Sequence, residues 1–448
     1  MSHDRPSLTP QAISYTPAYR RYVLVLLTLV YALNFIDRQI LVILQESIKA
    51  DMDLSDTQLG LLTGFAFAVF YVSVGIPIAR WADAGNRRNI ISLAIAVWSA
   101  MTALSGFTNN FFQLLLARIG VGVGEAGGSP PAHSIISDYY PPEQRGTALS
   151  FYSTGVYIGV LLGFLIGGWI NHTFGWRMAF LVVGLPGILV ALLVRLTIRE
   201  PLRGQSEAVK LDPNSVNQGA KFADTMAALW QLRSFRYFSV GAGLAAFISY
   251  GTGNFMPSFL IRSHGFSNLD VGASLALIAG FGGGLGTFLG GYIADKLGAK
   301  DIRWYMWISA LPAAISLPML LIALFSANTT LVLVFLFFTT LFGAFYLGPT
   351  IATTHTLLSP RMRAMGSAVL FLILNLIGLG MGPLFVGFLS DTLTPQFGSE
   401  ALRYALAITS LVALLAAFCF AMAASKLPQD LQRHRQTTEA ASWEGSAA

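Results

Sequence analysis

Twelve long apolar stretches constrain this chain more than any other feature of its sequence. A helix crosses the hydrocarbon core of a bilayer with about 20 apolar residues, and stretches of this kind recur along the whole chain. They cover residues 21–46, 57–81, 89–106, 111–136, 146–170 and 178–198, and then 234–261, 268–294, 303–325, 329–355, 365–390 and 401–425. The alternating pattern of a membrane β-barrel is absent. The sequence therefore predicts an all-α membrane protein with twelve transmembrane helices in two sets of six.

The composition excludes other classes of protein. Apolar residues make up 54% of the 448 residues and charged residues only 11%, whereas soluble domains have about 25% charged residues. A soluble enzyme, a disordered scaffold and a nucleic-acid-binding protein are therefore excluded. The single cysteine, Cys419, rules out an internal disulfide and a multi-cysteine metal site. We expect no metal, no cofactor and no catalytic activity.

Basic residues predict the orientation in the membrane. With both termini in the cytoplasm, 22 lysines and arginines fall in cytoplasmic segments and only four in outer loops, as the positive-inside rule requires. We expect a multi-pass protein of the inner cell membrane. Its predicted parts are a cytoplasmic tail (1–20), a six-helix bundle (21–198), a cytoplasmic linker (199–233), a second six-helix bundle (234–425) and a cytoplasmic tail (426–448).

The two sets of six spans are related by an internal repeat. Ala79–Arg88 after span 2 resembles Gly291–Lys300 after span 8, and Pro142–Ala148 before span 5 resembles Pro360–Ala368 before span 11. Such echoes indicate a duplicated six-helix unit. Parallel repeats of this kind flank a central site near the middle of the membrane.

These features resemble the major facilitator superfamily over essentially the whole chain. The loop Gly291–Lys300 matches the family pattern well, whereas the first copy has Ala79 and Asn86 where glycines are usual. Two membrane segments, Asn34–Arg38 and Arg118–Ala126, are similar to the Spinster branch. The resemblance implies the major facilitator fold, with two pseudo-symmetric bundles, and export of sphingoid or lysophospholipid substrates, often coupled to protons.

Charged residues in the middle of spans are the candidate site, because a charge there needs a partner or a cavity. Arg118 and Glu125 are seven residues apart and hence about 20° from sharing one face of a helix, while Asn34 shares a face with Asp37. The resemblance implies that spans 1 and 4 both line the cavity of the first bundle. Arg38 points about 100° away from Asp37, so we expect it to serve another partner, at the gate or on the substrate.

This constellation predicts proton coupling. Asp37 and Glu125 can take up and release protons as their surroundings change. Arg118 stays charged, so it pairs with an ionised carboxylate or, when both are protonated, with an anionic headgroup. The alternative is a static salt bridge between spans 1 and 4.

Other polar residues lie near span ends or in the second bundle. Residues that could form a cytoplasmic gate are Asp83, Arg87, Asp138, Arg145, Asp295, Arg361 and Arg363. Residues that could bind substrate from the second bundle are Tyr250, Asn254, Tyr346 and Asn375.

Glycines and prolines predict broken helices in spans 7, 10 and 11. A four-residue glycine repeat in span 5 predicts either a sliding contact or close static packing; its members are Gly155, Gly159, Gly163 and Gly167.

The sequence thus predicts a monomeric secondary transporter that works by alternating access. Its expected partners are the lipid bilayer, protons and an amphipathic lipid that it exports; it has no nucleic-acid partner. The alternative substrate is a small organic anion or sugar acid, and a non-transporting receptor is a third reading. A lipid carrier needs a long apolar sub-pocket beside the polar one, which distinguishes the first two.

Overall fold

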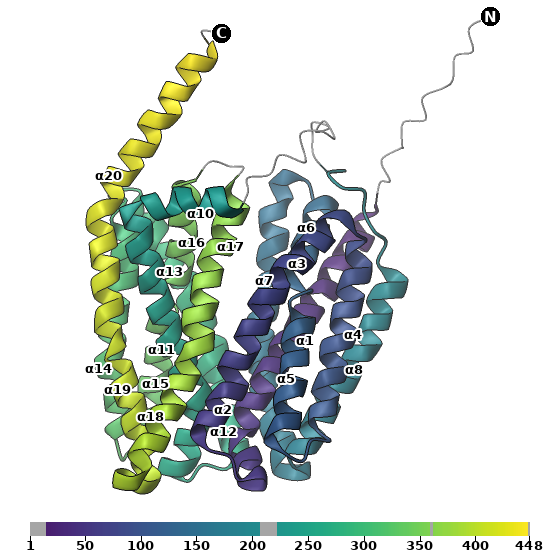
Figure 1. Ribbon diagram of the computed structural model, residues 1–448, viewed down its shortest axis with the longest axis vertical. Helices are drawn as coiled ribbons and strands as arrows, with labels where there is room; N and C mark the ends of the chain where they lie inside the picture. Colours follow the sequence, from purple (N-terminus) through teal and green to yellow (C-terminus); the bar gives the residue numbers. More distant parts are fainter. Residues whose placement is uncertain (1–14, 207–221, 359–361, 447–448) are drawn as a thin grey trace, which may run out of the picture.

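The computed structural model describes residues 15–206, 222–358 and 362–446, which form two helical bundles standing side by side (Figure 1). The first bundle contains α1 (Pro17–Met52), α2 (Asp56–Gly60), η1 (Leu61–Phe65), α3 (Ala66–Ala84), α4 (Arg87–Ser105), α5 (Phe111–Glu125), α6 (Ser129–Tyr139), α7 (Pro142–Phe174) and α8 (Trp176–Thr197). The short helix α10 (Phe222–Gln231) precedes the second bundle.

The second bundle repeats this arrangement. It contains α11 (Arg233–His264), α12 (Asn268–Leu275), η2 (Ala276–Gly282), α13 (Gly283–Gly298), α14 (Trp304–Phe325), α15 (Thr329–Gly343), α16 (Leu347–Thr356), α17 (Arg363–Ile373), η4 (Leu374–Met381), α18 (Gly382–Phe397), η5 (Gly398–Glu400), α19 (Ala401–Ser410) and α20 (Val412–Ser446). Helix α1 begins and helix α20 ends at the same end of the bundles, which we call the terminal side; the other end is the far side (Figure 1).

Together these helices make twelve crossings, which confirms the predicted fold class. Nine stretches of the described residues are long and apolar enough to cross a membrane, and one of them, Met365–Gln432, contains two crossings. The divided helix α5–α6 and helix α11 complete the set. Large apolar side chains cover the outer faces of the bundles, as at Leu189 and Leu196, which are 70% and 72% exposed.

Two crossings are interrupted at corresponding places of the repeat. In the first bundle α5 ends at Glu125 and α6 begins at Ser129; in the second, α15 ends at Gly343 and α16 begins at Leu347. The expected break in span 10 is therefore present, whereas the break in span 4 was not predicted. The expected break in span 7 is wrong, because α11 is continuous through Pro257. Span 11 changes to the π-helical segment η4 rather than breaking.

The bundles touch each other mainly on the far side, where α2 packs on α18 and α7 packs on α12 (Figure 1). Glycines permit this close approach. A Cβ atom on Gly60 would lie 2.3 Å from the carbonyl oxygen of Pro383, and one on Gly168 would lie 2.6 Å from that of Asn268. A buried apolar cluster, which includes Ile43 and Phe255, continues across the junction. The far side is therefore closed by packing.

The glycine repeat of span 5 lies elsewhere. Its four members face α1 within the same bundle, where added Cβ atoms would meet backbone or side-chain atoms at 2.4–2.8 Å. The repeat is thus a close packing face inside one bundle. The neighbouring residue Gly168, outside the repeat, contacts the other bundle.

Candidate functional site

The charged residues of spans 1 and 4 meet inside the first bundle. Asp37 and Arg38 lie in the middle of α1, Arg118 lies in α5, and Glu125 is the last residue of α5 before the helix break. Asp37, Arg118 and Glu125 are only 1–2% exposed. Asn34 lies beside Glu125. Two carboxylates and two guanidinium groups thus share one buried region, which we call the charged cluster (Asp37, Arg38, Arg118, Glu125).

The ion pair within this cluster differs from the predicted one. Arg38 Nε donates to Glu125 Oε2 over 2.7 Å, whereas Arg118 was the expected partner of either Asp37 or Glu125. The expectation that Arg38 serves a partner other than Asp37 agrees with this geometry. Seven residues of an α-helix rise about 10.5 Å, so Arg118 and Glu125 lie two turns apart on α5, whereas Arg38 of α1 reaches Glu125.

Arg38 is also surrounded by aromatic rings. Its guanidinium carbon lies 5.0 Å from the centroid of the Phe35 ring, 4.8 Å from that of Phe67 and 5.2 Å from that of Tyr71. Its side chain is 17% exposed, whereas that of Glu125 is fully buried. Arg38 is therefore the cation of the cluster that reaches toward the space between the bundles.

Arg118 is more deeply buried than Arg38, and its guanidinium group has unpaired hydrogen-bond donors among the described residues. Its Nε and Nη1 atoms have no hydrogen-bond partner among the described residues, and neither has Asp37 Oδ1. Trp98 and Thr102 of α4 lie beside Asp37, and their buried donors are likewise without partners in the described chain. Such groups are costly to leave unpaired, so this region suits water, a proton or a ligand group.

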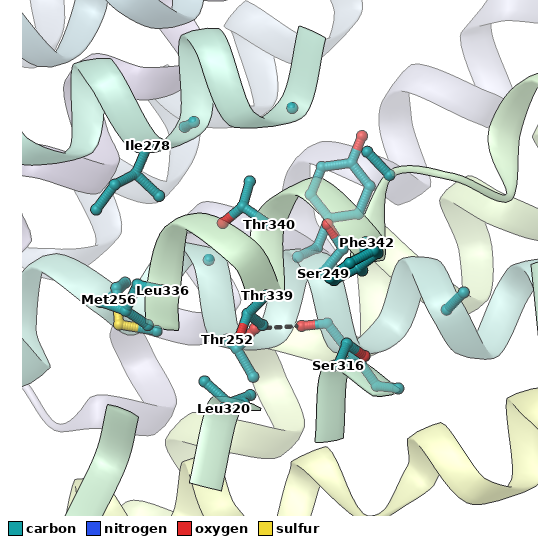
Figure 2. Close-up of a pocket in the computed structure, with 18 of the residues that line it drawn as sticks. Ser249, Thr252, Met256, Ile278, Ser316, Leu320, Leu336, Thr339, Thr340 and Phe342 are labelled. Atoms are coloured by element: carbon teal, nitrogen blue, oxygen red, sulfur yellow. Dashed lines mark hydrogen bonds between the residues drawn. The ribbon is translucent and has the colours of Figure 1, made fainter. Parts of the chain in front are cut away.

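A cavity of about 270 Å³ lies mainly among helices of the second bundle, and residues of α1 and α7 complete its wall. Apolar side chains form much of its wall, and the polar groups are hydroxyls and amides. Figure 2 shows Thr252, Thr339 and Ser316 close to one another on the wall of this cavity. None of its lining residues is charged. Gln39 lines the cavity from the first bundle, directly after Arg38 in the chain.

The predicted substrate residues divide between these two regions. Tyr250, Asn254 and Tyr346 line the cavity, and Tyr250 lies within electrostatic reach of Arg38. Asn375 lies in η4 and is not among the lining residues. Those assigned from the first bundle, Asn34, Arg38 and Arg118, lie outside the cavity wall.

The predicted gate residues on the terminal side contact their own bundle or the chain after α8. Buried Arg87 donates to Ser134 Oγ and Glu200 Oε1, both over 2.7 Å, and also pairs with Asp138. Arg145 Nη2 donates to Ser206 Oγ over 3.4 Å.

In the second bundle, Asp295 Oδ1 accepts from the Tyr305 hydroxyl over 2.8 Å, and Arg363 Nε donates to the His355 carbonyl over 3.2 Å. Arg361 and the side chain of Asp83 lie outside the described part of the chain. The described hydrogen bonds of these gate residues therefore do not connect the two bundles.

Comparison with known proteins identifies the family. The sequence profile of the Major Facilitator Superfamily matches residues 27–376. The chain belongs to the Major Facilitator Superfamily. It is therefore a membrane transporter and not an enzyme.

Individual relatives refine this placement. A solved bacterial homologue of the human lysosomal transporter Spinster, in an inward-facing and unoccupied conformation, is 34% identical; the match covers 93% of this chain and 99% of that one, with a TM-score of 0.86. An MFS-type efflux pump of Mycolicibacterium smegmatis is 34% identical over 90% of this chain and 92% of the pump. A probable galactarate/D-glucarate transporter of Bacillus subtilis is 29% identical over 66% of this chain and 69% of that protein.

On the far side, this facilitator has an ion-pair network that the sequence analysis missed. Arg262 of α11 donates to Glu46 of α1 over 2.6 and 3.0 Å and to Asp56 of α2 over 2.7 Å through two nitrogens. Asp391 of α18 accepts from the backbone N–H groups of Asp56 and Thr57 over 2.9 and 2.8 Å. We call these residues the far-side latch (Glu46, Asp56, Thr57, Arg262, Asp391).

The latch connects the bundles by side chains that stand at span ends. Acidic residues lie near the ends of spans 1 and 2, and one arginine lies in the loop after span 7. This pattern of charges was the available signal for the latch.

Proposed function

We propose that this transporter couples a proton to the export of an amphipathic substrate with one apolar chain, across the inner cell membrane. The observation that carries this proposal is the proximity of two different environments, a buried charged cluster and an uncharged, largely apolar cavity whose lining residue Tyr250 lies near Arg38. An amphipathic molecule needs both, because its headgroup requires charged or polar partners and its chain requires apolar walls.

The charge distribution supports the direction of transport. The positive-inside bias places the terminal side in the cytoplasm, so the far-side latch would close the outer end. The described conformation would then be inward-facing, which is also the state of the solved Spinster homologue. A substrate would enter from the cytoplasm or the inner leaflet and leave when the latch opens.

The charged cluster supports proton coupling. Its two carboxylates and two guanidinium groups balance when all are ionised, so an added proton leaves a buried net positive charge, which an anionic group of the substrate would neutralise. A proton on Glu125 would also weaken its pairing with Arg38. Proton binding thus changes the partner available to Arg38, which reaches toward the cavity.

The cavity supports a single-chain substrate. Its volume of about 270 Å³ is at or below the lower end of the roughly 300–1,000 Å³ that small-molecule sites occupy. Leu275, Ile278 and Leu320 contribute apolar wall, and hydroxyls such as Thr252 provide scattered polar contacts. The apolar wall fits a hydrocarbon chain better than a second charged group.

A small organic anion or sugar acid is the second candidate. The relative from Bacillus subtilis, a probable galactarate/D-glucarate transporter, favours it. The unpaired donors of Arg118 could bind a carboxylate, and the cavity hydroxyls could bind those of a sugar acid. No cation lines the cavity to balance a dicarboxylate, so we place this candidate second.

Uptake into proteoliposomes distinguishes the candidates. Purified protein is given a lysophospholipid panel and a sugar-acid panel, each with and without a pH gradient. We expect lysophospholipid flux that the gradient drives, and its loss in Glu125→Gln and Asp37→Asn. Glu143→Gln, which changes an exposed carboxylate at the start of α7, is the matched control. Sugar-acid flux alone would contradict the lipid proposal, and unchanged gradient-driven flux in both variants would contradict the coupling sites.

A further inference from the structure

The surroundings of Arg38 form a recognisable type of site. Three rings face one guanidinium at 4.8–5.2 Å from their centroids, and a carboxylate completes the shell at 2.7 Å. We call Phe35, Phe67, Tyr71 and Glu125 the aromatic cage. Aromatic faces attract cations within about 6 Å of the ring centroid, and cages of this composition recognise organic ammonium groups.

The cage is built to keep its shape. Phe67 stacks on Tyr71 with centroids 5.6 Å apart, and Phe35 contacts Tyr31 edge to face at 5.3 Å. Tyr31 in turn stacks on Tyr152 at 4.5 Å, almost parallel. Phe67 and Tyr71 thus support each other, and a second layer of rings supports Phe35, so the cage does not depend on Arg38 alone for its walls.

Arg38 itself is the movable part. It is the most exposed member of the charged cluster, and its long side chain can leave the cage without a change in the backbone. The cage also adjoins the cavity, because Gln39 lines the cavity and Tyr250 lies near Arg38. A molecule in the cavity can therefore present a cationic group to the cage.

We propose that the aromatic cage is a binding site for an organic ammonium group of the substrate, and that Arg38 occupies it between transport events. This inference rests on the proposed function and names one part of the substrate headgroup. The exchange conserves charge, since one cation replaces another beside Glu125. A zwitterionic headgroup would place its ammonium group in the cage, which leaves its anion for the released Arg38.

Chemical rescue tests the cage directly. In Arg38→Ala the cage is empty, so tetramethylammonium or guanidinium should occupy it. We expect both cations to bind this variant at least tenfold more tightly than the wild type and to raise its thermal midpoint, whereas potassium at equal concentration does neither. Arg38→Gln provides the same test if the alanine variant does not fold. Adding Phe67→Ala or Glu125→Gln to either variant should abolish the binding.

Arg177 supplies the matched control. Its guanidinium lies 4.1 Å from the Trp176 ring centroid and pairs with Asp51 at 2.8 Å, but this exposed site has one ring instead of three. Arg177→Ala should therefore gain no affinity for either cation. If both Arg38 variants bind tetramethylammonium no better than the wild type, or if Arg177→Ala gains as much, the cage proposal is overturned. Binding is measured without a gradient or lipid, so this result is independent of the transport assay.

Discussion

Corresponding places in the two bundles carry opposite kinds of side chain. At the helix break of the first bundle stands Glu125, within a cluster of buried charges; at the matching break of the second stands Gly343, which lines an uncharged cavity. Duplication therefore preserved the backbone interruption while the chemistry diverged. The first bundle holds the charged cluster and the second provides most of the cavity, and residues such as Gln39 and Tyr250 lie where the two regions approach each other.

We expect the largest effect on transport from placing a charge in the uncharged cavity of the second bundle. In Thr340→Asp a carboxylate faces the cavity without a partner, and burying an unpaired charge costs several kcal/mol. We expect transport to fall by about a hundredfold, which corresponds to roughly 2.7 kcal/mol. Thr340→Val removes only a hydroxyl and should keep most of the activity. Uptake is measured with thermal stability, and a folded Thr340→Asp with normal uptake would exclude the cavity from the transport route.

The converse test removes a charge from the charged cluster of the first bundle. Arg118→Ala should fold, because the carboxylates can take up a proton, but it should lose coupled transport. Arg118→Lys keeps the charge and loses the planar donors, so we expect badly impaired substrate binding with a small change in stability. Substrate affinity and thermal midpoint are measured on the same samples. Near-normal affinity in Arg118→Lys would leave a static salt bridge as the role of this arginine.

The far-side latch tests whether the bundles move as separate units. Arg262→Gln removes hydrogen bonds that join the first bundle to the second, and a coupling of roughly 1–3 kcal/mol would shift the population 5- to 150-fold. Spin labels at Asn109 and Ala327, with Cys419 replaced by serine, report the far-side distance between the bundles. We expect longer distances in Arg262→Gln. The control is Arg403→Gln, whose ion pair with Glu400 lies within one bundle; equal shifts in both variants would count against the latch.

A smaller effect is expected from the packing between the bundles. A methyl group at Gly168 would meet the Asn268 carbonyl oxygen at 2.6 Å, whereas nothing lies within 4 Å of one at Gly146 on the same helix. Gly168→Ala should therefore weaken far-side closure by about 1 kcal/mol, in the range of small overpacking changes, and Gly146→Ala should not. The same spin labels measure both variants, and identical distances would mean that the far side adapts to the methyl group.

Much of the fold could be predicted from the sequence, because membrane helices are determined by length and hydropathy. The twelve crossings and the repeat follow from local composition, and so do the charged positions in mid-span. The ion pairing did not follow: it depends on how far each helix rotates and where it ends. Arg118 and Glu125 share a face of α5 but lie two turns apart, and the packing of α1 within the first bundle brings Arg38 to Glu125.

The far-side latch escaped prediction for a related reason. Arg262 and Asp56 are far apart in the sequence and ordinary in composition, so only the docking of the two bundles brings them together. The continuity of α11 through Pro257 was likewise hidden, because a proline inside a membrane helix permits a bend without requiring one.

The π-helical segments η1, η2 and η4 allow one membrane crossing to pack against both bundles. A turn with an extra residue rotates the side chains beyond it by about 100° relative to a continuous α-helix. Helix α12 packs on α7 of the opposite bundle, whereas α13, beyond η2, packs on α14 and α15 of its own. One crossing therefore serves two neighbours with two differently oriented faces. In the proposed export cycle, the far-side half would belong to a contact that opens, and the other half to a contact that stays closed.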